Sequence, residues 1–163
     1  PQALALLPLA QRPQVRQQAG RTLAIAEAAY RQACVDAELT AFIDDMPSAL
    51  AWADLVVCRA GASTIAELSA AGSASVLVPF PFAVDDHQTH NAQYLVRVGA
   101  AILMPEHAMT PAVLSAVIAE LLGNRSKLQA MAEAARAQAW TGATTTIAST
   151  CVAVASARLE QAA

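Results

Sequence analysis

Short apolar runs alternate with longer, alanine-rich segments along this chain. Residues 55–58, 76–78 and 101–104 are apolar without alternation, which is typical of parallel strands that are covered on both faces. Weaker strand signals lie at residues 14–18 and 39–43. The alternation of strands and helices predicts an α/β fold with a doubly wound parallel sheet and additional C-terminal helices. Helical patterns fill residues 1–11, 21–37, 47–53, 63–71, 87–98, 111–122, 125–140 and 144–160.

The amino-acid composition and the net charge limit the classes of protein to which this chain can belong. The chain has 163 residues, of which 56% are hydrophobic and 14% are charged, so we expect one domain with a sizeable core. The net charge of −3 and the aromatic content of 4% argue against a nucleic-acid-binding protein. Three separated cysteines without a C-x-x-C motif favour a reduced, cytoplasmic protein without a zinc site. No apolar segment is long enough to span a bilayer. The missing initiator Met leads us to expect a piece of a longer protein.

Small residues occupy the turn that follows the strand at residues 55–58. The sequence Arg59-Ala60-Gly61-Ala62-Ser63 would let a ligand approach the backbone closely. The helix that starts here has N–H groups without internal partners, and these groups attract phosphate. A phosphate site and an ordinary tight turn with a solvated arginine are both compatible with this pattern.

An acidic residue in the same helix has two interpretations. Thr64-Ile65-Ala66-Glu67 matches the capping box T-x-x-E, in which Glu67 only caps its own helix. Alternatively, Glu67 accepts hydrogen bonds from two vicinal hydroxyls, as an acidic residue does for the ribose in dinucleotide sites. The pattern alone favours the cap, and it places Ile65 and Leu68 in the core.

A dense polar cluster, DDHQTHN, follows the strand at residues 76–78 and occupies residues 85–91. His87 and His90 are three apart and could share a helix face as metal ligands, but the two aspartates also suit a helix start. We favour ligand recognition over a metal site, with Gln88 and Asn91 as neutral partners for sugar hydroxyls.

Another predicted strand end lies at residues 42–46, FIDDM. Exposed backbone groups of Ile43 could pair with the edge of a planar base, although an ordinary strand-to-helix turn is favoured locally. Either aspartate could cap the following helix. No Ser-His-Asp order or pair of carboxylates identifies a catalytic group, so the catalytic residues stay unknown.

Three segments carry a family resemblance. FIDDM at 42–46, AWADLVVCRAGASTIAEL at 51–68 and DDHQTHNA at 85–92, in this order and spacing, resemble the C-terminal half of the MurG family. Members of that family transfer N-acetylglucosamine from UDP-N-acetylglucosamine to the undecaprenyl-pyrophosphoryl-muramyl-pentapeptide lipid of peptidoglycan synthesis. The resemblance covers almost the whole chain. It implies the GT-B architecture of two Rossmann-like domains, of which the C-terminal one binds the donor.

The resemblance also assigns roles to residues. It implies that the Ile43 backbone binds uracil, that Glu67 holds the ribose hydroxyls, and that Gln88, with His87, binds the N-acetylglucosamine hydroxyls. Arg59 would support the phosphate region, and the start of the helix would meet the diphosphate and the sugar. The expected donor-binding set is Phe42, Ile43, Met46, Arg59, Gly61, Ala62, Ser63, Thr64, Ile65, Ala66, Glu67, His87, Gln88 and Asn91.

Some family features are missing from the sequence. The family's glycine-rich phosphate loop and its N-terminal domain, with the acceptor site, the candidate catalytic base and the membrane-facing patch, have no counterpart in residues 1–163. Ala74 replaces a usual proline. We therefore expect a single donor-binding domain that is inactive alone but retains affinity for UDP. The resemblance further implies peripheral attachment to the cytoplasmic face of the bacterial plasma membrane, and neither a cofactor nor a tightly bound metal.

The implied reaction is inverting. The acceptor 4-hydroxyl attacks the anomeric carbon of the donor and UDP leaves, while backbone N–H dipoles and Arg59 stabilise the charge on the diphosphate. Two alternatives stay open. One is another GT-B transferase or epimerase that uses a UDP-sugar, and the other is a non-catalytic α/β binding module.

Overall fold

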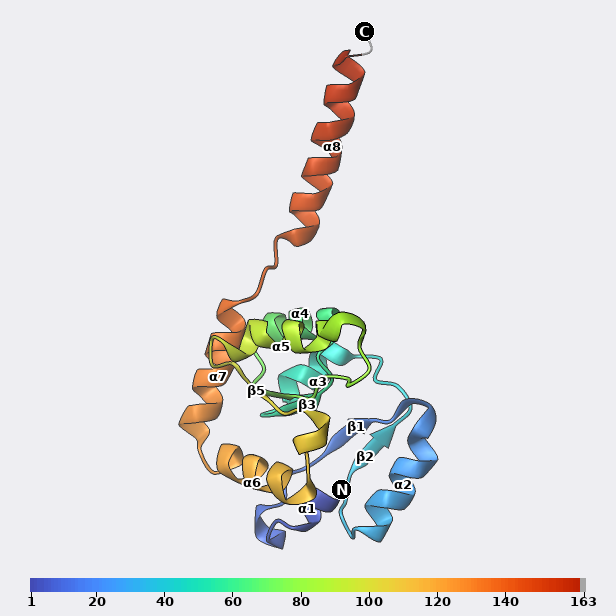
Figure 1. Cartoon of the computed structure of the whole chain (residues 1–163), viewed down its shortest axis with the longest axis vertical. Coiled ribbons are helices and arrows are strands. Elements are labelled where there is room, and N and C mark those ends of the chain that lie inside the picture. The colour runs from blue at the N-terminus through green and yellow to red at the C-terminus, as the bar shows by residue number, and fades with distance from the viewer. Residues whose placement is uncertain (162–163) are drawn as a thin grey trace.

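The computed structural model describes residues 1–161, and for residue 84 and residues 157–161 it describes the backbone alone. Strands and helices alternate along the chain (Figure 1). The strands are β1 (Arg16–Gln18), β2 (Glu38–Thr40), β3 (Val56–Cys58), β4 (Ser75–Leu77) and β5 (Ala101–Leu103). The helices are α1 (Gln2–Ala5), α2 (Leu23–Gln32), α3 (Met46–Trp52), α4 (Ala62–Ala71), α5 (His87–Val96), α6 (Pro111–Leu122), α7 (Arg125–Ala137) and α8 (Ala143–Gln161). Short 3₁₀ turns are η1 (Leu9–Gln11), η2 (Gly20–Thr22), η3 (Val84–Asp86) and η4 (Glu106–Ala108).

Each strand and helix expected from the sequence is present, although several helices end earlier than predicted, and two of them are much shorter. The helix expected over residues 1–11 ends at Ala5 and resumes only as the 3₁₀ turn η1. Pro8 lies at the break, where it can neither donate a backbone hydrogen bond nor fit the preceding turn. The helix expected over residues 21–37 ends at Gln32, because Cys34 takes the left-handed conformation with φ of 51°.

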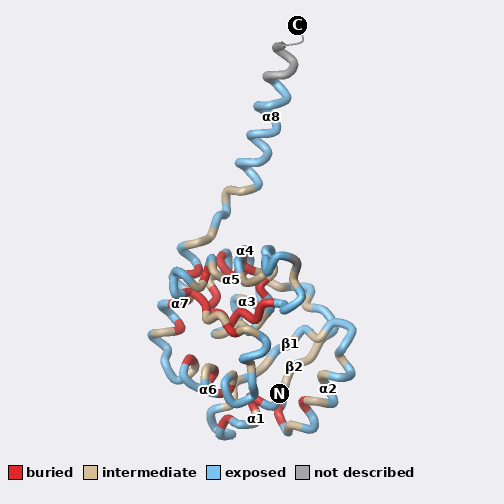
Figure 2. The backbone as a smooth tube through the Cα atoms, viewed as in Figure 1, coloured by how far each residue is buried: buried red, intermediate tan, exposed pale blue. Residues whose placement is uncertain are grey.

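Strands β3, β4 and β5 form a parallel sheet with β4 in the centre. Every residue of β4 is buried, and its side chains join two different clusters. Val76 belongs to a cluster with Leu121, whereas Leu77 belongs to a cluster with Leu68 and Leu95. Helices therefore cover both faces of this strand, which confirms the doubly wound pattern. Buried segments, red in Figure 2, lie mainly near the labelled helices α4, α5 and α7, with others near α1 and α6.

The strands are divided between two sheets, which the sequence did not predict. β1 and β2 pair in parallel as a separate sheet, and no described strand joins β1 to β3. A doubly wound sheet has the order 3-2-1-4-5-6. When β1 and β2 are taken as strands 2 and 3 of that order, the pair β2-β1 matches the part 3-2, and the sheet β3-β4-β5 matches the part 4-5-6.

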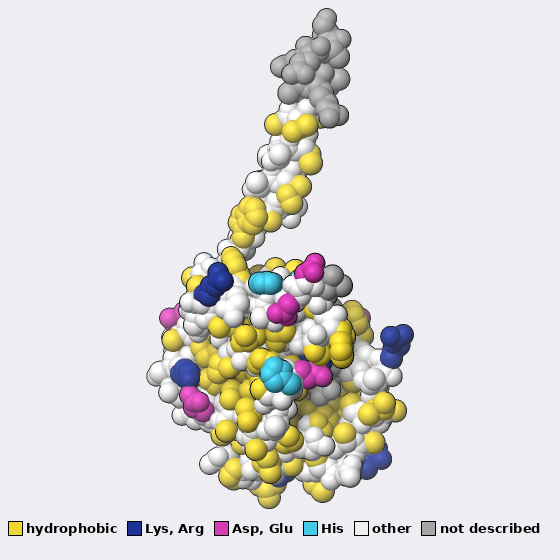
Figure 3. Space-filling view, viewed as in Figure 1, with side chains coloured by type: hydrophobic (Ala, Val, Ile, Leu, Met, Phe, Trp, Pro, Cys, Tyr) yellow, Lys and Arg dark blue, Asp and Glu magenta, His cyan; other side chains and the backbone are white. Residues whose placement is uncertain are grey.

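β3 lies at the edge of the three-stranded sheet, and one of its apolar side chains is partly exposed to solvent. Val57 of β3 is 44% exposed, although we expected this apolar strand to be covered on both faces. Its in-register neighbour Val76 is fully buried because it lies in the central strand. Hydrophobic side chains cover much of the face shown in Figure 3, and charged side chains occupy only a small part of it.

A shared apolar cluster connects the two sheets. Leu4, Tyr30 and Ile118 are buried in it, and Leu39 of β2 and Leu55, directly before β3, are partly buried and pack against it. The Tyr30 hydroxyl donates to Oε1 of Gln17 at 2.8 Å. The body of the protein therefore has a continuous core despite the division of its strands.

The last helix, α8, projects away from the body (Figure 1). Residues 144–156 of this helix are exposed, including Ile147 at 62% and Val152 at 66%. The predicted C-terminal helix is therefore confirmed as an element, but its described side chains add nothing to the core. Within residues 1–161, no helix has both the length and the apolar character needed to cross a membrane.

We predict that the double coverage of β4 dominates folding stability. Leu77→Ala removes a fully buried side chain and should lower the free energy of unfolding by about 2–5 kcal/mol, measured by urea denaturation. Leu9→Ala is the matched control, because Leu9 is 80% exposed and its loss should change stability by less than about 0.5 kcal/mol. Equal losses for the two variants would contradict this account of the core.

Candidate functional site

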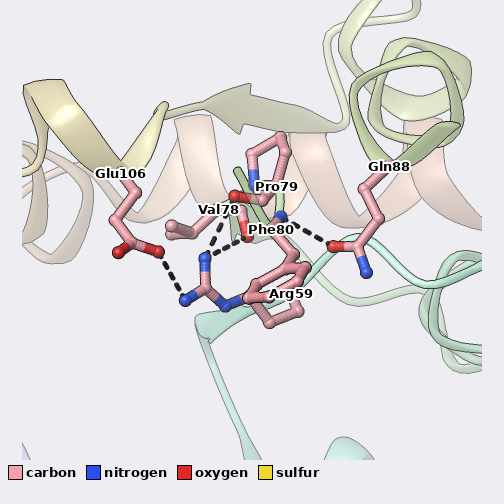
Figure 4. Close-up of polar contacts among 6 residues, drawn as sticks. All are labelled: Arg59, Val78, Pro79, Phe80, Gln88 and Glu106. Carbon is pink, nitrogen blue, oxygen red and sulfur yellow. Dashed lines mark hydrogen bonds and ion pairs between the residues drawn. The ribbon is translucent and has the colours of Figure 1, made fainter. Parts of the chain in front are cut away.

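The carboxyl ends of β3, β4 and β5 lie at one edge of their sheet because the strands are parallel. The segments that follow these strands are joined by side-chain contacts (Figure 4). Arg59, after β3, donates from Nη1 to the carbonyl oxygen of Pro79, after β4, at 3.0 Å. The same arginine pairs through Nη2 with Oε2 of Glu106, after β5, at 2.5 Å. The polar segments that the sequence singled out are therefore brought together at this edge.

The start of α4 is an uncapped helix N-terminus. Gly61 is the N-cap residue and provides no side-chain cap. The N–H of Ile65 donates to the carbonyl of Gly61 at 3.0 Å, so the N–H groups of Ala62, Ser63 and Thr64 have no acceptor within the helix. Ala62 and Ser63 are exposed and Thr64 is half-buried. This helix start can therefore accept an anion.

Two residues of the expected set differ in their exposure within α4. Ile65 is only 6% exposed and packs in the core, as the sequence indicated, so its side chain is not available to a ligand. Ala66 is exposed on the outer side of the helix. A ligand can therefore reach the backbone at the helix start but not the side chain of Ile65.

The capping-box interpretation of Glu67 is wrong. The helix begins at Ala62 with Gly61 as N-cap, so Thr64 is already inside the helix and Glu67 lies in its second turn. The Glu67 side chain is exposed. Burial, and to a smaller extent the negative charge of Glu67, raise the pKa of the Cys58 thiol to about 11. Glu67 therefore lies near the end of β3 with its carboxylate accessible, which suits the alternative as a hydroxyl acceptor.

Arg59 is held by contacts within the protein, so its side chain is not free in solvent as the tight-turn alternative assumed. Phosphate binding at this turn stays a prediction. Besides its bonds to Pro79 and Glu106, Nη1 lies 3.4 Å from the carbonyl oxygen of Val78. Its Cζ atom lies 5.5 Å from the centre of the Phe80 ring. Sequence reasoning missed Glu106. The signal available was an acidic residue just after a predicted parallel strand, since such residues share the edge where ligands bind.

The two amides of α5 point back at the strand ends. Oε1 of Gln88 accepts a hydrogen bond from the N–H of Phe80 at 2.9 Å, and Nδ2 of Asn91 donates to the carbonyl of Ala60 at 3.1 Å. Both residues lie in the expected place, but Asn91 secures the turn before α4. The hydrogen bond of Gln88 among the described residues uses its oxygen, which leaves the amide nitrogen, with two N–H donors, for a further partner.

The acidic and histidine residues at the start of α5 do not form a metal cluster. His87 and His90 are exposed, and Asp86 uses its carboxylate to accept from the Thr89 hydroxyl at 2.7 Å. In the part of the chain that the structure describes, no group of three or more His, Cys, Asp or Glu side chains could hold a metal ion.

A second candidate region precedes α3, which packs against α4. Phe42 is 66% exposed, and Ile43 and Met46 are half-buried. The N–H of Ile43 donates to Oε1 of Gln18 at 2.9 Å, so a side-chain amide already occupies the group expected to meet a base. Sequence reasoning missed Gln18, because residues 25 positions apart along the chain give no local signal for this contact.

The turn at residues 44–45 behaves as predicted. The Asp45 carboxylate accepts from the N–H of Ser48 at 3.0 Å and caps α3. Hydrogen bonds from the side chain and the backbone of Ser48 lower the pKa of Asp45. The cap fixes the direction in which α3 leaves the strand end.

Comparison with known proteins identifies the family. Residues 1–147 match the model of the glycosyltransferase family 28 C-terminal domain. Among curated proteins, transferases named UDP-N-acetylglucosamine--N-acetylmuramyl-(pentapeptide) pyrophosphoryl-undecaprenol N-acetylglucosamine transferase are similar. The protein from Marinobacter nauticus is 52% identical over 93% of this chain, and the one from Chromohalobacter salexigens is 59% identical over 85%. The chain spans only 42% and 38% of these two relatives.

A solved structure agrees with these relatives. The crystal structure of Acinetobacter baumannii MurG matches with a TM-score of 0.81 and 40% sequence identity, over 89% of this chain and 44% of that one. The resemblance inferred from the three sequence segments and the α/β fold class are thereby confirmed. Since the family model covers nearly all of the body described above, the chain belongs to glycosyltransferase family 28, in which it represents the C-terminal domain.

Proposed function

We propose that this chain is the donor-binding domain of an inverting glycosyltransferase. The reaction would transfer N-acetylglucosamine from UDP-N-acetylglucosamine to undecaprenyl-pyrophosphoryl-N-acetylmuramyl-pentapeptide. The observation that carries this proposal is the uncapped start of α4, which follows a parallel strand and has the exposed Glu67 carboxylate in its next turn. The names of the similar transferases support the choice of donor and acceptor.

Each part of the donor has a counterpart in the proposed site. The diphosphate binds the N–H groups of residues 62–64, and Glu67 accepts hydrogen bonds from the ribose hydroxyls. The uracil pairs with the backbone of Ile43, and the hexose meets the free amide nitrogen of Gln88. Negative charge grows on the diphosphate as UDP leaves, and fixed N–H dipoles stabilise that charge without having to reorganise. In this proposal a tightly bound metal is not needed.

Acceptor binding and base catalysis are not assigned to residues of this chain. Because the chain spans less than half of the length of these relatives, we assign the acceptor site and the catalytic base to the rest of such a protein. The lipid-linked acceptor implies contact with the cytoplasmic face of the bacterial plasma membrane, made mainly by that other part.

Calorimetric titration of the 163-residue chain with UDP and with UDP-N-acetylglucosamine tests the proposal. We expect both to bind, and UDP-glucose to compete less well than UDP-N-acetylglucosamine. Equal competition would favour a different UDP-sugar enzyme. The proposal fails if UDP binds neither this chain nor a chimera that joins the preceding residues of the Marinobacter nauticus relative to Pro1.

Replacement of Glu67 distinguishes ribose binding from a structural role. Glu67→Ala should weaken UDP binding about tenfold, because two hydroxyl partners are lost, and it should leave the affinity for 2′,3′-dideoxy-UDP nearly unchanged. Glu27→Ala is the matched control, since Glu27 is an exposed glutamate within α2, which has the same length of 10 residues as α4. A Glu67→Ala variant that binds UDP as tightly as the parent would remove Glu67 from the site.

Replacement of Gln18 tests whether uracil uses the Ile43 backbone. Gln18→Ala frees the N–H of Ile43 from its present acceptor and should strengthen UDP binding about threefold to tenfold, as measured by calorimetry. The neighbouring Gln17→Ala serves as control, because Gln17 contacts the Tyr30 hydroxyl instead. If Gln18→Ala leaves the affinity unchanged, the base does not compete for this N–H.

A further inference from the structure

The peptide unit between Pro79 and Phe80 is held from two sides. Its carbonyl oxygen accepts from Nη1 of Arg59 at 3.0 Å, and its N–H donates to Oε1 of Gln88 at 2.9 Å (Figure 4). A peptide unit is planar, so its C=O and N–H turn together. The contact that fixes the direction of the Pro79 carbonyl therefore also fixes the direction in which Phe80 presents its N–H to Gln88.

Arg59 is in turn fixed by Glu106. A guanidinium is a rigid planar fork, and bonds at two of its nitrogens determine its orientation. Nη1 contacts the end of β4, while Nη2 pairs with Oε2 of Glu106 at 2.5 Å. The two side chains are 47% and 43% exposed, and such pairs contribute little to folding stability. The pair therefore acts mainly on the geometry of the site.

The loop that follows this peptide unit needs such anchors. Residues 79–86 lie in the connection from β4 to α5 and include two successive non-glycine residues in the left-handed region, Asp85 with φ of 52° and Asp86 with φ of 51°. Left-handed conformations of this kind persist only where surrounding contacts hold them. Arg59 holds the start of the loop, and Gln88 holds it from the first turn of α5.

We propose that Glu106 is a positioning residue for the sugar part of the donor. It acts through Arg59 and the Pro79–Phe80 peptide unit, and it sets the orientation of the Gln88 carboxamide, whose nitrogen donates to the hexose hydroxyls. This inference rests on the proposed function, in which Gln88 contacts N-acetylglucosamine. Because the UDP part binds at α4 and at Ile43, loss of Glu106 weakens recognition of the sugar and leaves recognition of UDP unchanged.

Hydrogen exchange of the Phe80 amide tests the positioning step without any ligand. Glu106→Ala should accelerate exchange at Phe80 about fivefold, and Glu106→Gln should restore part of the protection because it retains an oxygen acceptor. The control is Glu120→Ala, which removes another exposed pair, that of Glu120 and Lys127 at 2.6 Å on α6 and α7. Unchanged exchange at Phe80 in Glu106→Ala would overturn the proposal.

Calorimetry of the same variants tests the consequence for the donor. Glu106→Ala should raise the Kd for UDP-N-acetylglucosamine about fivefold and change the Kd for UDP less than about twofold, whereas Glu120→Ala should change neither. Equal weakening of both ligands would mean that Arg59 acts on the diphosphate, and it would overturn the sugar-specific role. If neither the parent chain nor the chimera that carries the preceding residues binds either ligand, the proposed function fails and the sugar role fails with it, while the exchange experiment still decides whether Glu106 orients the loop.

Discussion

Burial of β4 on both faces requires helices on each side of its sheet. Val76 and Leu77 point to opposite clusters, one formed with α6 and α7 and the other with α4 and α5. Because neighbouring strands run in the same direction, the chain must pass through a crossover helix after each strand before it forms the next one. The segments after β3, β4 and β5 therefore meet at one edge, and the helices that follow begin there. This constraint places the start of α4, the loop at residues 79–86 and Glu106 in one region.

Polar groups that the apolar core cannot hydrogen-bond lie together at this edge of the sheet. The first N–H groups of α4 have no internal acceptor, while Arg59, Gln88 and Asn91 bond to carbonyl and N–H groups of the turns. The hydrogen bonds of these side chains hold the turns around the start of α4 in place. They leave the N-terminal end of the helix dipole open to a ligand. A preorganised site of this kind suits a leaving diphosphate, because the charge that develops during reaction meets dipoles already in place.

The sequence predicted the elements well because burial and capping are local signals. The unalternated apolar run of β4, the proline start of α6 and the Asp45 cap of α3 were all confirmed. The T-x-x-E pattern misled, since the N-cap residue is Gly61, three residues before Thr64. Contacts across the chain, such as those of Arg59 with Glu106 and of Gln18 with Ile43, depend on tertiary placement. The division of the strands into two sheets likewise has no signature in residue periodicity.

The central claim is that the start of α4 binds the diphosphate of a UDP-sugar. A crystal structure of this chain with UDP-N-acetylglucosamine measures this most directly. We predict phosphate oxygens within hydrogen-bonding distance of the N–H groups of residues 62–64, and ribose hydroxyls on the carboxylate of Glu67. A complex in which the diphosphate lies away from this helix start, with Glu67 in solvent, would contradict the account.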